Sequence, residues 1–167
     1  PRRRSAGGPQ VNSRGTQGTQ SDVPGATSPL EVFRATPMQR VELLKAGLSA
    51  RDAMSIVADL AIPTSRACKA INISRASLTR KARQNVALAL PEAERVLGVA
   101  KLIGQVQQMV EESGNPTGFD ASAWVSSWLV EPLPALGGGL PIDLLDTMEG
   151  QGLVAKLLRQ IQGGVYV

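Results

Sequence analysis

The sequence predicts an all-α protein, and three observations support this prediction. Phe, Trp and Tyr make up only 3% of the 167 residues, so a core must be built from Leu, Val, Ile and Ala. Apolar residues recur at helical spacing in several segments. No segment alternates apolar and polar residues for long enough to indicate a strand.

The first part of the chain differs from the rest. Residues 1–29 are rich in Gly, Ser, Thr, Gln and Pro and carry almost no large apolar side chains. Such a segment buries too little surface to offset the entropy of ordering, so we expect a disordered tail. Its arginines, Arg2, Arg3 and Arg4, either contact DNA phosphates or simply lie in solvent.

Helices are expected from Leu30 onward. A short helix should end near Gly47, and another should follow Ser49, a candidate N-cap, and stop at Pro63. Thr64 is expected to cap a helix over residues 65–71, and Ser74 one over about 75–88.

The remaining helices flank two turn-rich stretches. Pro91 is expected to open a long helix that runs to Val110, and the Gly and Pro cluster at 113–118 predicts a boundary. A helix with Asp120 near its start carries Trp124 and Trp128, which we interpret as core residues. After a Pro and Gly loop, Pro141 opens a short helical turn. The last helix should start at Thr147 and close at Gly163 and Gly164.

Several chemistries are excluded by composition. The chain has no histidine and only one cysteine, Cys68, which we interpret as a small buried apolar residue. Neither a His-based catalytic triad nor a Cys/His metal site is therefore expected, and we expect no cofactor. The paired acids Asp143 and Asp146 are interpreted as helix-start and solubility groups rather than as a catalytic pair.

Neither end of the chain nor its apolar runs indicate a membrane. No run approaches the roughly 20 apolar residues that span a bilayer, and the basic start lacks the apolar stretch of a signal peptide. We therefore expect a cytoplasmic protein that makes no membrane contact.

Charge is distributed unevenly. Residues 1–110 contain 16 Lys and Arg against 7 Asp and Glu, a net charge of +9, whereas residues 111–167 contain 2 against 7, a net charge of −5. This asymmetry indicates two surfaces with different partners, of which the basic one suits nucleic acid.

The basic surface coincides with a candidate helix-turn-helix. Asn72 lies where the tight turn needs a left-handed backbone, Ile73 plugs the turn, and Ser74 caps the second helix. Leu78, Ala82 and Val86 are expected to share the buried face of that helix. No acidic residue occurs between Asp59 and Glu92, so nothing in this run repels phosphate. The alternative is an ordinary α-hairpin with a solvated basic face.

If this pair binds DNA, the start of its second helix enters the major groove. We expect Arg75, Ser77, Thr79 and Arg80 near base edges, and Arg66, Lys69, Lys81 and Arg83 on phosphates.

The C-terminal helix offers a second binding surface. Leu153, Val154, Leu157, Leu158 and Ile161 are expected on one arc, opposite Lys156 and Arg159. That arc either seals a small core or docks on a partner. The closing Val165, Tyr166 and Val167 follow a Gly pair and either enter a partner's pocket or fold back.

The segment from Trp128 to Val167 resembles the toxin-binding domain of the Xre/MbcA/ParS antitoxins. The shared pattern is Trp-Leu, a Pro-containing loop, Leu-Gly-Gly, Pro-x-Asp/Glu-Leu-Leu, then Gly-x-x-x-Val, a Leu-rich helix and a closing Gly with an aromatic residue. The matching residues are Trp128, Leu129, Pro132, Leu136, Gly137, Gly138, Pro141, Leu144, Leu145, Gly150, Val154, Leu157, Leu158, Gly163 and Tyr166. Upstream, Ser74, Arg75, Leu78, Arg80 and Arg95 are similar to the family's helix-turn-helix. Asn72 in place of Gly and the long polar tail depart from the pattern.

The resemblance implies a bacterial type II antitoxin with an Xre-like helix-turn-helix region over residues 30–112 and a small helical toxin-binding domain over 113–167. Its partners would be operator DNA and a RES-domain toxin that consumes NAD or uses it for ADP-ribosylation. The antitoxin would block the toxin's active site, repress its own operon, and form a homodimer or a larger hetero-oligomer with the toxin. The expected toxin-binding residues are Leu153, Lys156, Leu157, Arg159, Gln160, Gly164, Val165, Tyr166 and Val167. The alternative is a stand-alone repressor, also not an enzyme, whose C-terminal module only dimerises.

Overall fold

The computed structural model describes residues 28–164, and over this range the all-α prediction is confirmed. The helices are α1 (Pro29–Arg34), α2 (Pro37–Ala46), α3 (Ala50–Asp59), α4 (Thr64–Ala70), α5 (Arg75–Arg83), α6 (Leu90–Glu112), α7 (Ala121–Leu129) and α8 (Met148–Gln162). Two 3-10 helices, η1 (Pro134–Leu136) and η2 (Pro141–Leu144), lie between α7 and α8. The expected tail at 1–29 lies mostly outside the described residues, but Ser28 caps α1 and Pro29 is its first residue.

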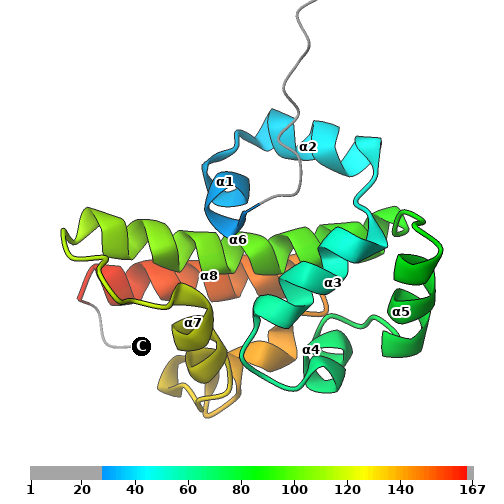
Figure 1. The fold of residues 1–167 in the computed structure, drawn as a ribbon. Helices are drawn as coiled ribbons and strands as arrows, with labels where there is room; N and C mark the ends of the chain where they lie inside the picture. The colour runs from blue at the N-terminus through cyan, green and yellow to red at the C-terminus, as the bar shows by residue number, and fades with distance from the viewer. Residues whose placement is uncertain (1–27, 165–167) are drawn as a thin grey trace, which may run out of the picture.

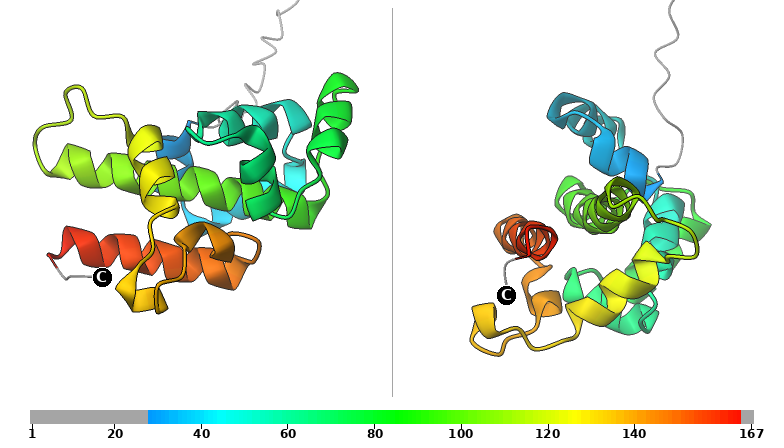
Figure 2. Two further views of the ribbon diagram at one scale, coloured as in Figure 1. Left: turned by 90° about the horizontal axis from the view of Figure 1, so that it is seen from below. Right: turned by 90° about the vertical axis from the view of Figure 1, so that its left-hand side faces the viewer.

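Helix α6 is the axis of the molecule (Figure 1). It has 23 residues, and those from Val96 to Val106 are buried almost without a break, because neighbouring helices cover this part of α6 on several sides. Helices α1 and α2 lie on one side, α3, α4 and α7 lie on the other, and α8 runs alongside (Figure 2). One apolar cluster joins residues of the N-terminal and C-terminal halves around this axis.

Helices α6 and α8 run parallel. Gln105 of α6 donates to the carbonyl of Ala155 at 2.9 Å, and seven residues further along α6 Glu112 accepts from Gln162 at 3.0 Å. The apolar face of α8 that the sequence predicts is buried at Val154, Leu157 and Leu158. The C-terminal helix is thus seated on the same core as the basic half.

Helix α1, which the sequence did not delimit, is held against α6 by a close approach. A Cβ built on Gly104 would lie 2.0 Å from the carbonyl oxygen of Pro29. Only glycine permits the two backbones to come this near. Arg40 of α2 then closes the end of α1 by donating to the carbonyls of Val32, Phe33 and Ala35.

Most predicted helix starts are confirmed, and one is wrong. Ser49, Ser74, Asp120 and Thr147 each accept a hydrogen bond from a backbone N–H in the first turn of the helix that follows. Thr64 is itself the first residue of α4, and Pro63 takes the N-cap position without a side-chain bond.

The expected extent of the second basic helix also needs correction. Helix α5 ends at Arg83, and the chain then turns through Asn85, whose φ is 53°. Val86 therefore lies outside the helix and is 45% exposed, rather than buried with Leu78 and Ala82. Its carbonyl instead accepts from the N–H of Ala50 at 3.0 Å, which ties this loop to the start of α3.

Candidate functional site

The turn between α4 and α5 has the geometry of a helix-turn-helix. Asn72 adopts a φ of 51°, the left-handed conformation that the sequence predicts for it. Ile73 is 5% exposed and donates its N–H to the carbonyl of Cys68 at 2.9 Å. The Ser74 hydroxyl accepts from the N–H of Ser77 at 3.3 Å and so starts α5.

Cys68 packs inside this pair. It is 1% exposed, and burial raises the pKa of its thiol despite the opposing charge of Arg75. A thiol in this state is a poor nucleophile at neutral pH, because the thiolate is the reactive form. The interpretation of Cys68 as a core residue is therefore confirmed.

Arg95 of α6 holds the turn between α4 and α5 in place by hydrogen bonds. Its Nε donates to the carbonyl of Ile71 at 2.7 Å, and an Nη donates to the carbonyl of Asn72 at 3.2 Å. These carbonyls end α4, where a guanidinium is favoured by both hydrogen bonding and the helix dipole. The turn is thus held by a side chain 23 residues further along the chain.

The outward face of α5 is polar and basic. An open concavity along it is lined by Arg75, Ala76, Thr79, Arg80, Arg83 and Gln84. Helix α5 lies at one end of the molecule (Figure 1). Of the predicted DNA-contacting residues, Arg66, Lys69, Arg75, Arg80 and Arg83 are exposed, whereas Ser77, Thr79 and Lys81 are partly buried.

Lys81 differs from the other basic residues of the pair. Its Nζ lies 2.6 Å from a carboxylate oxygen of Glu92, one of two ion pairs among residues 28–164; the other is Arg34–Glu111. Burial on its own would raise the pKa of Glu92, but the hydrogen bond and charge of Lys81 and the N–H of Ala89 lower it overall. In the free chain, the acid that ends the acid-free run is thus neutralised by this lysine.

A groove of about 230 Å³ separates α4 from η2. One wall carries Arg66 and Lys69, and the other carries Asp143 and Asp146. All four side chains are exposed. Neither carboxylate accepts a side-chain hydrogen bond from a described residue. Asp143 lies in the first turn of η2, as the helix-start role expected for it requires. Asp146 lies in the turn between η2 and α8, and the N-cap of α8 is Thr147.

Helix α8 presents a solvent-facing stripe. Leu153 is 42% exposed, so it lies on the side of Lys156 and Arg159 rather than on the apolar arc. Of the other predicted toxin-binding residues, Leu157 is 4% exposed and packs in the core, Gln160 is partly buried and Gly164 is exposed. Val165, Tyr166 and Val167 lie outside the described residues. Met148, 48% exposed, is an apolar residue of this helix that the sequence did not single out.

Gln151 seats α8 on α6. Its Nε2 donates to the carbonyl of Arg95 at 3.0 Å and to that of Leu145 at 2.8 Å, while its Oε1 is buried with no protein partner. A Cβ on Gly98 would lie 1.5 Å from this Oε1. This contact was not predicted from the sequence, although a glycine inside an apolar helical run can indicate a close approach.

The two tryptophans predicted for the core stack on each other. Their ring centroids lie 6.1 Å apart with an interplanar angle of 9°, and Trp128 is 6% exposed. On the same helix, the Ser126 hydroxyl accepts from the N–H of Ala61 at 2.8 Å. Helix α7 therefore holds the loop that leads into α4.

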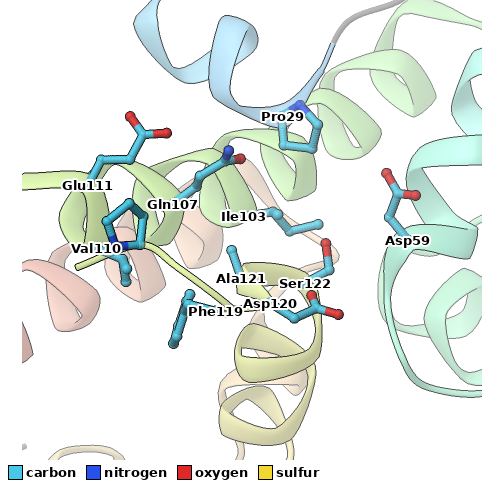
Figure 3. A pocket seen from close by; sticks show the side chains of 11 residues that line it. Pro29, Asp59, Ile103, Gln107, Val110, Glu111, Phe119, Asp120, Ala121 and Ser122 are labelled. Atoms are coloured by element: carbon cyan, nitrogen blue, oxygen red, sulfur yellow. The ribbon is translucent and has the colours of Figure 1, made fainter.

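A separate pocket of about 420 Å³ lies between the end of α6 and the start of α7 (Figure 3). Three carboxylates line it, but Glu111 is paired with Arg34 and Asp120 caps α7, which leaves Asp59. Within residues 28–164 no cluster of metal-ligating side chains occurs, and no helix is long and apolar enough to cross a bilayer.

Known proteins are similar in sequence to this chain. Residues 118–164, which include α7, η1, η2 and α8, match the family model of the antitoxin Xre/MbcA/ParS C-terminal toxin-binding domain. The chain is 49% identical over 135 residues to the Prs ADP-ribosylating antitoxin of Sphingobium sp. (strain YBL2). The aligned residues make up 81% of this chain and 85% of that protein. This chain therefore belongs to the Xre/MbcA/ParS family of antitoxins, whose C-terminal domain binds a toxin.

Proposed function

We propose that this antitoxin has two working surfaces. Helices α4 and α5, within residues 30–112, bind operator DNA and repress the antitoxin's own operon. The segment over residues 113–167 covers the active site of a RES-domain toxin in the bacterial cytoplasm. The observation that carries the proposal is the match of residues 118–164 to a toxin-binding domain, on a chain whose other half holds a basic helix-turn-helix.

The DNA-binding half is supported by the charge and position of α5. Its outer face combines exposed Arg75, Arg80 and Arg83 with a capped start, and that start is the part of a recognition helix that enters the major groove. A cationic face of this kind gains affinity by releasing counterions from DNA. One such helix buries too little surface for tight specific binding, so we propose a dimer.

Arg80→Ala tests the DNA surface. We expect it to weaken binding to the promoter region of the operon in a gel-shift assay by about tenfold, as expected for the loss of a contact worth 1–3 kcal/mol. The matched control is Arg159→Ala, an exposed arginine on α8, which should leave DNA binding unchanged. Equal affinities of Arg80→Ala and the wild-type chain would refute the DNA assignment.

The toxin's chemistry is proposed from the relative. Because that relative is named an ADP-ribosylating antitoxin, we propose that the partner here ADP-ribosylates a protein target rather than only degrading NAD. The exposed stripe of α8 supports a docking role, since it combines Leu153 and Met148 with the cations of Lys156 and Arg159.

Co-expression with the neighbouring toxin gene tests the second surface. We expect the wild-type chain to relieve growth arrest, and Leu153→Asp with Lys156→Glu to relieve it poorly while binding DNA normally. Deletion of residues 164–167 should also impair relief more than DNA binding. If the wild-type chain does not relieve the arrest, the stand-alone repressor becomes the better explanation.

Size measurement of the copurified proteins tests assembly. Multi-angle light scattering of the antitoxin alone and with the toxin gives both stoichiometries. A monomeric antitoxin that still binds the promoter region of the operon tightly would contradict the proposed dimer.

A further inference from the structure

The fold places two acidic residues next to the basic helix pair, although the sequence of that pair contains none. No Asp or Glu occurs between Asp59 and Glu92, and Glu92 is neutralised by Lys81. Across the groove of about 230 Å³, however, η2 and the turn that follows it bring Asp143 and Asp146 opposite Arg66 and Lys69. The acids come from the toxin-binding segment and the cations from the first helix of the DNA-binding pair.

The two walls are close but not bonded. The ion pairs within residues 28–164 involve neither Arg66 nor Lys69, so no carboxylate lies within 4.0 Å of their nitrogens. Exposed charges on opposite walls of so small a groove lie within a Debye length of about 10 Å at 0.1 M salt. Each acid therefore lowers the positive potential that the two cations present to a phosphate.

We propose that Asp143 and Asp146 act as an electrostatic brake on DNA binding, competing with DNA phosphates for Arg66 and Lys69. This inference rests on the proposed DNA-binding function. In this way the charge of the toxin-binding segment acts on the DNA surface.

The test is Asp143→Asn with Asp146→Asn, assayed by fluorescence anisotropy with a 30-base-pair duplex of random sequence. The electrostatic part of binding does not depend on sequence, so no operator is needed. We expect the double variant to bind about three- to tenfold more tightly than the wild-type chain at 50 mM salt. The gain should shrink at 200 mM salt, because screening weakens the brake. A gain in affinity is not a result that partial unfolding produces.

Two matched controls separate a local effect from net charge. Glu42→Gln with Glu131→Gln removes the same two charges from exposed positions on α2 and after α7. Helix α2 lies on the opposite side of α6 from α4 (Figure 2). This control pair should change the affinity by less than about twofold. In an Arg66→Gln, Lys69→Gln background, the effect of the Asp143→Asn and Asp146→Asn substitutions should fall to the same level.

The possible results separate a failure of the proposed electrostatic effect from a failure of the proposed DNA-binding function. Three results overturn the inference alone, provided that Arg80→Ala weakens duplex binding. They are an unchanged affinity of the Asp143→Asn, Asp146→Asn variant, an equal gain in the control pair, and a gain that survives in the Arg66→Gln, Lys69→Gln background. If the wild-type chain does not bind the duplex at all, the DNA-binding function and the brake are both overturned.

Discussion

Replacing Gly98 with alanine adds a methyl group where α8 meets α6. The new Cβ would lie 1.5 Å from the Oε1 of Gln151 and 2.6 Å from its Cδ, so the amide must move. Gln151 is only 4% exposed and its Nε2 holds the carbonyls of Arg95 and Leu145. We expect an amide displaced by the new methyl group to lose or lengthen both bonds.

The magnitude follows from these contacts. Two hydrogen bonds contribute about 1 kcal/mol each, and crowding a packed interior costs about 1–3 kcal/mol more. Alanine recovers about 1 kcal/mol, because it is the better helix former. We expect Gly98→Ala to lower the free energy of unfolding by about 3 kcal/mol, measured by urea denaturation.

Gly152→Ala is the matched control for this experiment. Gly152 lies on the exposed side of α8, and nothing lies within 4 Å of its added Cβ. This variant should be about 0.5–1 kcal/mol more stable than the wild-type chain. In a Gln151→Ala background, Gly98→Ala should cost less than about 1 kcal/mol, because the blocking amide is gone. The reasoning fails if Gly98→Ala and Gly152→Ala have the same stability in the wild-type background.

Three further predictions concern the basic half. Asn72→Gly should leave the melting temperature nearly unchanged, whereas Asn72→Val should cost about 1–2 kcal/mol, because its φ of 51° suits glycine and not a β-branched residue; equal melting curves would contradict this. Arg95→Met keeps the apolar stem but loses the bonds to the carbonyls of Ile71 and Asn72, so both stability (by about 1–3 kcal/mol) and duplex affinity should fall, and unchanged values in both assays would show that the clamp is dispensable. Since the folded-state pKa of Glu92 is below its ordinary value of 4.5, its contribution is fully present above that pH and is lost as the pH falls through the folded pKa. Denaturation at pH 3–6 should therefore show a flatter stability profile for Glu92→Gln, and a profile identical to that of the wild-type chain would refute the role of the Lys81 pair.

The helix caps and the left-handed turn could be predicted from the sequence, because interactions between residues close together in the chain determine them. Ser49, Ser74, Asp120 and Thr147 cap helices because a short polar side chain reaches a backbone N–H three residues ahead. The left-handed Asn72 was predictable for a similar reason, since few residues tolerate that backbone conformation.

The predictions of burial were wrong where contacts with residues far apart in the sequence determine which side chains are buried. Val86 continues the periodicity of α5 but leaves the helix, because the chain turns at Asn85 and pairs with the start of α3. Leu153 has an apolar side chain and still faces solvent, because Val154, Leu157 and Leu158 already fill the space against α6. Periodicity assigns a residue to a face, but the position of the neighbouring helix sets how wide the buried face is.

The sequence by itself determined the all-α class, most of the helix starts, the capped turn and the absence of acids around it, because each depends on residues a few positions apart. Only the tertiary structure decided that Arg95 clamps the turn, that Gln151 seats α8 beneath it, and that Asp143 and Asp146 face Arg66 and Lys69. Those contacts join residues 23 or more positions apart, at distances set by helix packing around α6. No local pattern in the sequence encodes such distances.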